Sequence, residues 1–272
     1  LAKTALEKKV ESIEGEFKES LNYAQRIQRT LLPTVEEIQA LFPKSYQADV
    51  LFQPKDVVSG DFYWGTKVHN RTIFFVGDAT GHGVSGSFIT ILATNILENL
   101  AKEKMVILPD LLLEELHKQL QIKLRQTDES SERSVLDSLE GYAVLIEEDK
   151  VTIASAMRPI IVVGENGLQN IAGTRKTIGG KQFMGDEYFT SHTITLNSGE
   201  AIYLYSDGIE SQIGGYDGQQ KFGKSQVIEL ISQAHELPFS KRSRGIFKKI
   251  QDWKGFFAEQ SDDIVFAVIE KQ

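Results

Sequence analysis

Residues 59–64 read Ser-Gly-Asp-Phe-Tyr-Trp, and residues 77–83 read Gly-Asp-Ala-Thr-Gly-His-Gly. Each stretch places an aspartate, Asp61 or Asp78, at the end of a short apolar strand, and the second stretch runs into a glycine-rich turn. The two aspartates are 17 positions apart. Two strands joined by a turn near residues 69–71 would return the chain to the same end of a sheet. We therefore expect a hairpin that brings the two carboxylates together.

Two further strand ends downstream carry aspartates in similar settings. Asp207 follows an apolar run at residues 201–205, and Asp262 and Asp263 come just before the final apolar run. A single aspartate at a strand end is often only a turn former or a helix cap, but recurrence at four strand ends indicates a shared site. Carboxylate oxygens are the ligands that Mg2+ and Mn2+ prefer, and a pair of such ions is a hydrolytic device. The pattern predicts a divalent metal site.

Composition limits the kinds of partner. The chain has 272 residues, of which 41% are hydrophobic, and a net charge of −8. This length suits one large domain or two small ones. An acidic chain argues against nucleic acid as the main partner, because phosphate backbones require clustered Lys and Arg. The basic cluster at residues 241–249 is interpreted as a solvated helix face.

Three features of the sequence concern its location. The chain has no cysteine, which excludes disulfides and thiolate metal sites and fits a reducing compartment, so we expect a cytoplasmic protein. No apolar run in the sequence approaches the roughly 20 residues of a membrane helix, and no signal peptide is visible. The chain begins with Leu1 rather than Met, so we expect a sensor or membrane segment upstream.

Residues 1–32 are predicted to form one helix that ends at Pro33. A short a/d seam repeats at spacings of four, three and four along Leu6, Val10, Ile13 and Phe17. It continues only after a shift of register. Two interpretations stay open: a helix packed on its own domain, or a linker coiled coil that dimerises.

From residue 46 the pattern changes to short runs rich in Val, Ile, Phe and Tyr, separated by turn signals. These runs predict strands at 46–53, 60–66, 71–78, 140–147, 150–155, 159–164, 191–196, 200–206 and 262–270. Amphipathic patterns predict helices at about 84–104, after Pro109, and at about 224–236 and 240–252. Blocks of strands that alternate with blocks of helices predict an α+β fold, in which helices pack outside antiparallel sheets.

Six motifs in order carry a resemblance to a known family. They are residues 24–28 (Ala-Gln-Arg-Ile-Gln) with 31–33, then 59–63, 77–84, 178–180 (Ile-Gly-Gly), 203–209 (Tyr-Leu-Tyr-Ser-Asp-Gly-Ile) and 260–264 (Gln-Ser-Asp-Asp-Ile). Together they resemble the PPM-type, or PP2C-like, protein serine/threonine phosphatases, in the bacterial SpoIIE/RsbU-like branch. Each piece alone is weak, but the six span residues 24–270 in the family's order. The resemblance implies a PP2C-like β-sandwich of antiparallel sheets flanked by helices, preceded by an N-terminal helix.

The resemblance also implies a metal centre with two ions, Mn2+ or Mg2+. By this resemblance Asp78 would bridge both ions, Asp207 and Asp262 would complete one of them, and Asp61 with the carbonyl of Ala79 would complete the other. Asp263 is a supporting partner or an alternative ligand. The four catalytic residues that follow are Asp61, Asp78, Asp207 and Asp262. A water or hydroxide between the ions attacks phosphorus in line with the serine or threonine oxygen.

Three other residues are candidates for minor roles. His82 is read either as an acid for the leaving group or as a structural cap of the helix that begins near Gly83. A basic residue that grips the substrate phosphate is not evident, and Lys55 and Arg158 are the candidates. The structural alternative for both is an ordinary solvated side chain.

Similar proteins act in bacterial partner switching, which implies a phosphoprotein phosphatase that acts on phosphoserine or phosphothreonine of a small STAS-type antagonist. Receptor phosphatases of the SiaA type are one variety. Residues 1–32 would then be a linker or switch helix, with possible homodimerisation, and residues 33–272 the phosphatase domain. The alternatives are a pseudophosphatase scaffold, which has no need for mutually repelling carboxylates, and a hydrolase of small phosphoesters.

Overall fold

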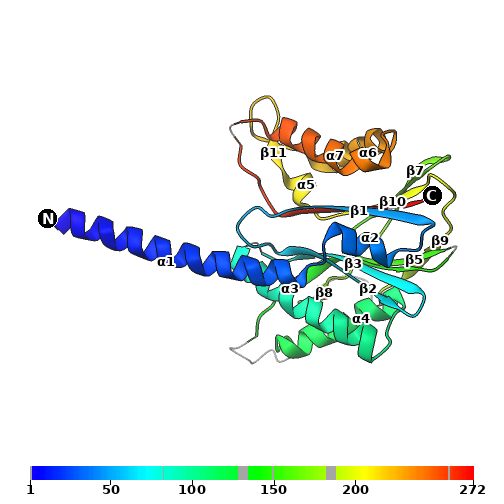
Figure 1. Cartoon of the computed structure of the whole chain (residues 1–272), viewed down its shortest axis with the longest axis horizontal. Coiled ribbons are helices and arrows are strands. Elements are labelled where there is room, and N and C mark those ends of the chain that lie inside the picture. The colour runs from blue at the N-terminus through cyan, green and yellow to red at the C-terminus, as the bar shows by residue number, and fades with distance from the viewer. Residues whose placement is uncertain (1, 82, 128–133, 149, 182–187, 257) are drawn as a thin grey trace.

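The computed structural model describes the whole chain except residues 1, 82, 128–133, 149, 182–187 and 257. Two antiparallel sheets face each other at its centre, and helices cover the outer face of each sheet (Figure 1). One long helix, α1, projects away from this body. The predicted α+β sandwich with flanking helices and a preceding N-terminal helix is confirmed.

The two sheets are formed by strands that lie far apart in the sequence. The five-stranded sheet has the order β1 (Tyr46–Gln53), β13 (Ile264–Lys271), β10 (Ala201–Tyr205), β6 (Ile160–Gly164) and β7 (Gly167–Ile171). The six-stranded sheet has the order β2 (Asp61–Val68), β3 (Arg71–Ala79), β4 (Ser138–Ile146), β5 (Val151–Ala156) and β9 (Ser191–Ile194), and β8 (Ile178–Gly179) pairs with β4. All nine predicted strands are present, with ends shifted by at most two residues.

The helices form the two outer layers. On the six-stranded sheet lie α3 (Gly83–Glu98), the π-helical turn η1 (Asn99–Glu103) and α4 (Pro109–Lys123). On the five-stranded sheet lie α6 (Gly223–His235) and α7 (Phe239–Lys254). The short elements α2 (Val35–Leu41), α5 (Gly208–Ser211), β11 (Ile213–Gly214) and β12 (Gln220–Lys221) were not predicted, and neither were β7 and β8.

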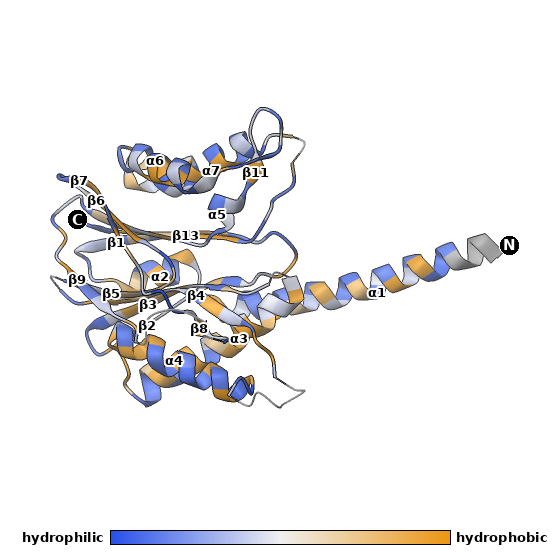
Figure 2. Cartoon of the chain, turned by 180° about the vertical axis from the view of Figure 1, so that it is seen from behind, coloured by the Kyte–Doolittle hydropathy of each residue, from blue (hydrophilic) through white to orange (hydrophobic). Residues whose placement is uncertain are grey.

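The core follows from this layering. A sheet that is covered on both faces needs strands that are apolar at every position, and the run 201–205 (Ala-Ile-Tyr-Leu-Tyr) is buried throughout. Residues that alternate along it point in opposite directions. Leu204 therefore packs between the sheets with Phe74 and Tyr142, whereas Tyr203 packs under α6 and α7. Figure 2 shows the apolar sides of the outer helices turned toward the sheets.

The continuous helix formed by α3 and η1 is long and strongly apolar. At 21 residues (Gly83–Glu103) it is long and apolar enough to cross a membrane, although the sequence reading found no such run. Within the fold, 56% of the most apolar 18-residue stretch of this helix is buried. Ala93, Leu97 and Leu100 belong to the core against the six-stranded sheet. A buried core helix accounts for this apolar character.

Helix α1 (Ala2–Leu31) is attached to the body only near its end. Val10, Ile13 and Phe17 are 46%, 57% and 61% exposed, so these three positions of the apolar seam have no cover within the described chain. Gln28, by contrast, is buried. Packing on the chain's own domain therefore holds only for the last turns of the helix.

Candidate metal centre

Asp61 and Asp78 lie directly opposite each other on neighbouring strands. Asp61 is the first residue of β2, Asp78 is the penultimate residue of β3, and the antiparallel register pairs them. The register continues to Val68 and Arg71, so a tight turn closes the hairpin. The prediction that this hairpin unites the two carboxylates is confirmed.

Burial makes this pair electrostatically costly. Asp61 is 2% exposed, and its Oδ2 atom has no hydrogen-bond partner. Burial raises the pKa of Asp61 well above its usual range, and the charge of Asp78 raises it further. Burial, followed by the charge of Asp207, also raises the pKa of Asp78 to about 7. Two neighbouring carboxylates, one buried and one partly buried, favour either a bound proton or a cation.

The other sheet brings the remaining aspartates to the same place. The backbone N–H of Asp207, just after β10, donates to Asp78 Oδ2 at 3.4 Å. Asp262 lies just before β13, which pairs with β10. Burial raises the pKa of Asp207; Arg158 opposes that shift and the charge of Asp262 adds to it. The site is thus assembled where one end of each sheet meets the other.

Asp263 supports the loop before β2. Its Oδ1 accepts the backbone N–H of Lys55 at 2.7 Å, and its Oδ2 accepts the backbone N–H of Gly60 at 2.8 Å. The side chain is almost fully buried. Both oxygens are therefore engaged by backbone amides, and Asp263 holds the chain that leads into Asp61.

Close backbone packing surrounds the carbonyl of Ala79. A Cβ atom on Gly60 would collide with the carbonyl oxygen of Gly81 and lie 3.1 Å from that of Ala79. A Cβ on Gly86, in the first turns of α3, would also collide with Gly81. Glycine at both positions lets α3 approach the loop that carries the carbonyl groups. His82, considered as an acid or a cap, lies outside the described residues.

A buried arginine stands behind the aspartates. Arg158 is 7% exposed, and its guanidinium lies 3.3 Å from Glu210, 3.8 Å from Glu140 and over the ring of Tyr205 at 5.2 Å. Glu140 lies opposite Asp78 in the β3–β4 register. The sequence reading missed Glu140 and Glu210, although a glutamate inside the apolar run of β4 was a visible signal. Arg158 is therefore a buried counter-charge, not the solvated side chain of the structural alternative.

The residues fit a divalent cation by their chemistry. The donors are all oxygens, Asp61 is buried, and one of its carboxylate oxygens is unpartnered. Across the described ranges, no group of three or more His, Cys, Asp or Glu side chains is gathered closely enough to form a ready metal cage. The carboxylates are thus neighbours whose repulsion a cation would relieve.

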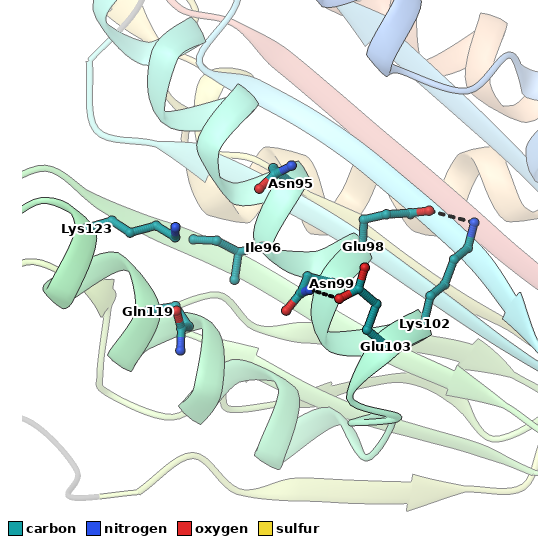
Figure 3. A pocket seen from close by; sticks show the side chains of 8 residues that line it. All are labelled: Asn95, Ile96, Glu98, Asn99, Lys102, Glu103, Gln119 and Lys123. Carbon is teal, nitrogen blue, oxygen red and sulfur yellow. Dashed lines mark hydrogen bonds and ion pairs between the residues drawn. The ribbon is translucent and has the colours of Figure 1, made fainter.

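A polar hollow elsewhere on the protein is unrelated to this centre. It lies between α3, η1 and α4 and has a volume of about 400 Å3 (Figure 3). Glu98 pairs with Lys102 at 2.6 Å, and Asn99 donates to Glu103. None of the aspartates lines it.

Comparison with known proteins identifies the class. The structure resembles the SiaA-PP2C domain of Pseudomonas aeruginosa (TM-score 0.82, 23% identity, 96% of this chain and 99% of that one). It also resembles the PP2C phosphatase domain, with a fragment of the regulatory domain, of SpoIIE from Bacillus subtilis (TM-score 0.63, 12% identity, 83% of this chain and 63% of that one). A third match is RsbX in complex with magnesium (TM-score 0.56, 13% identity, 85% of this chain and 98% of that one). These likenesses show a PP2C-type fold.

Sequence identifies the family. The model of stage II sporulation protein E (SpoIIE) matches residues 69–272, which is most of the chain. The chain belongs to the SpoIIE family, and it is by family an enzyme of the PP2C-type serine/threonine phosphatases, which depend on divalent metal. The resemblance inferred from the six motifs is confirmed. No curated protein matches the chain in sequence.

Proposed function

We propose that the protein is a phosphatase that removes phosphate from serine or threonine of a regulatory partner protein, with two divalent ions, Mn2+ or Mg2+. One observation carries the proposal: the buried Asp61 faces the partly buried Asp78, and the Asp207 amide of the other sheet donates to Asp78. A fold stabilises such an arrangement poorly unless a cation occupies it.

Five residues would hold the ions in this proposal: Asp61, Asp78, Asp207 and Asp262 through carboxylates, and Ala79 through its backbone carbonyl. When bound, divalent ions would lower the pKa of a water molecule and neutralise charge on the phosphoryl oxygens. We assign Asp263 the supporting role, because both of its oxygens already accept backbone amides.

The chain's own residues would prepare the site. Asp263 fixes the backbone before Asp61, so that this carboxylate faces Asp78. Arg158 pairs with Glu140 and Glu210. Its charge lowers the pKa of Asp78 and Asp207, so it would limit the negative charge that accumulates in the cluster. A fixed set of donors costs little reorganisation during phosphoryl transfer.

Helix α1 is proposed as a switch helix (residues 1–32) ahead of the phosphatase domain (residues 33–272). Gln28 binds the backbone of Ser59 twice: its Nε2 donates to the Ser59 carbonyl at 2.6 Å, and its Oε1 accepts the Ser59 N–H at 3.0 Å. Ser59 lies two positions before Asp61, so movement of α1 would reach the metal centre. The exposed Val10, Ile13 and Phe17 support a homodimer through this helix.

The proposed partner is a phosphorylated STAS-type antagonist of a partner-switching system, and the proposed location is the cytoplasm, downstream of a sensor. Structural relatives support this setting, since one was described in connection with the bacterial stressosome and another is the cell fate determinant SpoIIE. The acidic net charge of −8 disfavours nucleic acid as a partner.

The test combines metal binding with activity. Wild type and Asp207→Ala are compared by calorimetry with Mn2+ and by phosphate release from a phosphopeptide and from p-nitrophenyl phosphate. We expect metal-dependent activity that Asp207→Ala lowers at least 100-fold. Failure of the folded wild type to bind millimolar Mn2+ would refute the proposal and favour a scaffold. A preference for p-nitrophenyl phosphate would favour a small-phosphoester hydrolase.

A further inference from the structure

Strands β11 and β12 form a small hairpin that packs beside α7 (Figure 1). Its register pairs Ile213 with Lys221 and Gly214 with Gln220. The β11–β12 hairpin follows Asp207 after the short helix α5. Lys221 is only 14 positions beyond Asp207 in the sequence, and the hairpin turns the chain back toward the stretch that it has just left.

Gln212, which is fully buried, ties this hairpin to the segment that leads into Asp262. Its side-chain Nε2 donates to the carbonyl of Glu259 at 3.0 Å, and its Oε1 accepts the N–H of Ser261 at 3.3 Å. Its backbone carbonyl accepts the N–H of Phe222, at the end of the hairpin, at 2.8 Å. One buried residue thus fixes both the hairpin and the approach to the metal centre.

The first strand of the hairpin is fixed as well. The N–H of Ile213 donates to Ser261 Oγ at 2.9 Å, and Ser261 immediately precedes an aspartate of the metal centre. Gly214 lies so close to Trp253 that a Cβ atom at position 214 would collide with the Trp253 carbonyl. Ile213 is the strand partner of Lys221, so the lysine side chain starts from a rigid backbone close to the metal centre.

The side chain of Lys221 is exposed and forms no salt bridge or hydrogen bond with the part of the chain that the structure describes. Its charge nevertheless acts on the metal centre. Burial raises the pKa of Asp207, and two cations oppose that shift, Arg158 first and Lys221 second. Arg158 is already paired with Glu140 and Glu210. Lys221 is therefore a positive charge beside Asp207 that no described carboxylate neutralises.

We propose that Lys221 binds the phosphoryl group of the substrate, an inference that rests on the phosphatase function proposed above. A phosphate monoester carries about two negative charges at neutral pH, and it must enter a site lined by carboxylates. A lysine ammonium is a compact positive charge with three donors on a flexible stem, so it can turn toward a phosphoryl oxygen without a fixed approach direction. Lys221 thus strengthens the attraction of the site for the substrate phosphate.

Lys221 suits this role better than the two basic residues that the sequence suggested. Arg158 is buried, and a substrate oxygen could bind its guanidinium only by displacing a glutamate. Lys55 is partly buried, and its backbone N–H is held by Asp263. The sequence reading did not select Lys221, because its position beside Asp207 depends on the hairpin.

The experiment compares wild type with Lys221→Met, Lys221→Arg and Lys224→Met at saturating Mn2+. Lys224, at the start of α6, is also exposed, so Lys224→Met is a control with the same change of charge. Steady-state kinetics are measured with p-nitrophenyl phosphate, which has no peptide part, and with a phosphoserine peptide. Inorganic phosphate is tested as a competitive inhibitor. Calorimetry measures Mn2+ affinity, and circular dichroism checks each fold.

We expect Lys221→Met to raise the KM of both substrates and the inhibition constant of phosphate at least fivefold. The kcat should change less than threefold, because the lost contact binds the phosphoryl group before and during the reaction alike. Mn2+ affinity should not weaken, because a lysine repels a metal ion and its removal cannot cost attraction. Lys221→Arg should stay within threefold of wild type, and Lys224→Met within twofold.

An unchanged KM in Lys221→Met would overturn the inference and leave the proposed function standing. A higher KM for the phosphopeptide alone would also overturn it, because Lys221 would then contact the peptide chain and not the phosphoryl group. Mn2+ binding weakened more than threefold would assign Lys221 to support of the metal site instead. A folded wild type that binds no Mn2+, or hydrolyses neither substrate, would refute the proposed function and this inference together.

Discussion

Replacing Asp78 with Asn is expected to stabilise the metal-free protein at neutral and alkaline pH while it removes metal binding. The reason is the proton that the buried carboxylate keeps. Its pKa is raised from 3.8 to about 7, by burial first and then by the charge of Asp207. The folded state therefore binds this proton more tightly than the unfolded chain does. The stabilisation that this proton gives the folded state is complete below about pH 4 and is lost as pH rises through 7.

The size of the effect follows from the same shift. A rise of roughly three pH units at about 1.36 kcal/mol each amounts to ~4 kcal/mol as an order of magnitude. An asparagine at position 78 has no charge to bury, so it avoids this cost at every pH. For a domain of this size, we expect a gain in melting temperature of about 5–10 °C at pH 8 without metal.

Urea unfolding in EDTA, followed by circular dichroism at pH 5, 6, 7 and 8, measures the difference. The unfolding free energy of wild type should fall by a few kcal/mol over this range, and the fall should be clearly smaller for Asp78→Asn. Glu165→Gln, an exposed change of the same charge, should follow wild type. Parallel pH profiles for wild type and Asp78→Asn would refute the reasoning. Saturating Mn2+ should reverse the order, because only wild type gains stability by binding.

Substitutions at three further residues test the surroundings of the site. Asp263→Ala removes two backbone hydrogen bonds, so it should destabilise the fold by about 2–3 kcal/mol and abolish activity. Asp263→Asn should retain part of the stability and part of the activity. Equal stability of wild type and Asp263→Ala in urea unfolding would contradict the supporting role. Gln28→Ala leaves the Ser59 amide without its partner and should change activity at least fivefold at unchanged Mn2+ affinity, as kinetics and calorimetry would show. Arg158 lowers the pKa of Asp78 and of Asp207. Arg158→Met should therefore raise both pKa values and shift the pH–activity profile to higher pH. An unchanged profile would show that Arg158 does not influence these aspartates.

Much of the fold was readable because some strands are apolar at every position and turns between strands carry Gly, Asn or Pro. The run at 201–205 and the hairpin around residues 69–71 are of this kind. Helix α2 was missed although Thr34 and Glu37 form a capping box, because the helix is only one or two turns long. Strand β7 was missed because its residues are mostly exposed, which weakens the apolar signal.

The candidate site was readable in its residue types but not in its supports. The position of aspartates at strand ends predicted which carboxylates belong to the candidate site. The register of the hairpin explains why two of them lie opposite each other. The role of Asp263 depends on which backbone amides its oxygens reach, and no sequence spacing encodes that. Arg158 and Glu140 meet through strand pairing and a loop, so their partnership emerges only from the assembled sandwich.

The two hydrogen bonds between Gln28 and the backbone of Ser59 connect α1 to the strand that carries Asp61. A helix of 30 residues extends about 45 Å, and its far end lies well away from the body. Both bonds to Ser59 come from one amide group. In the proposed switch, a rotation of α1 by a single residue step, about 100°, would break both bonds together. Rotation about the helix axis is therefore the movement that we expect this contact to detect.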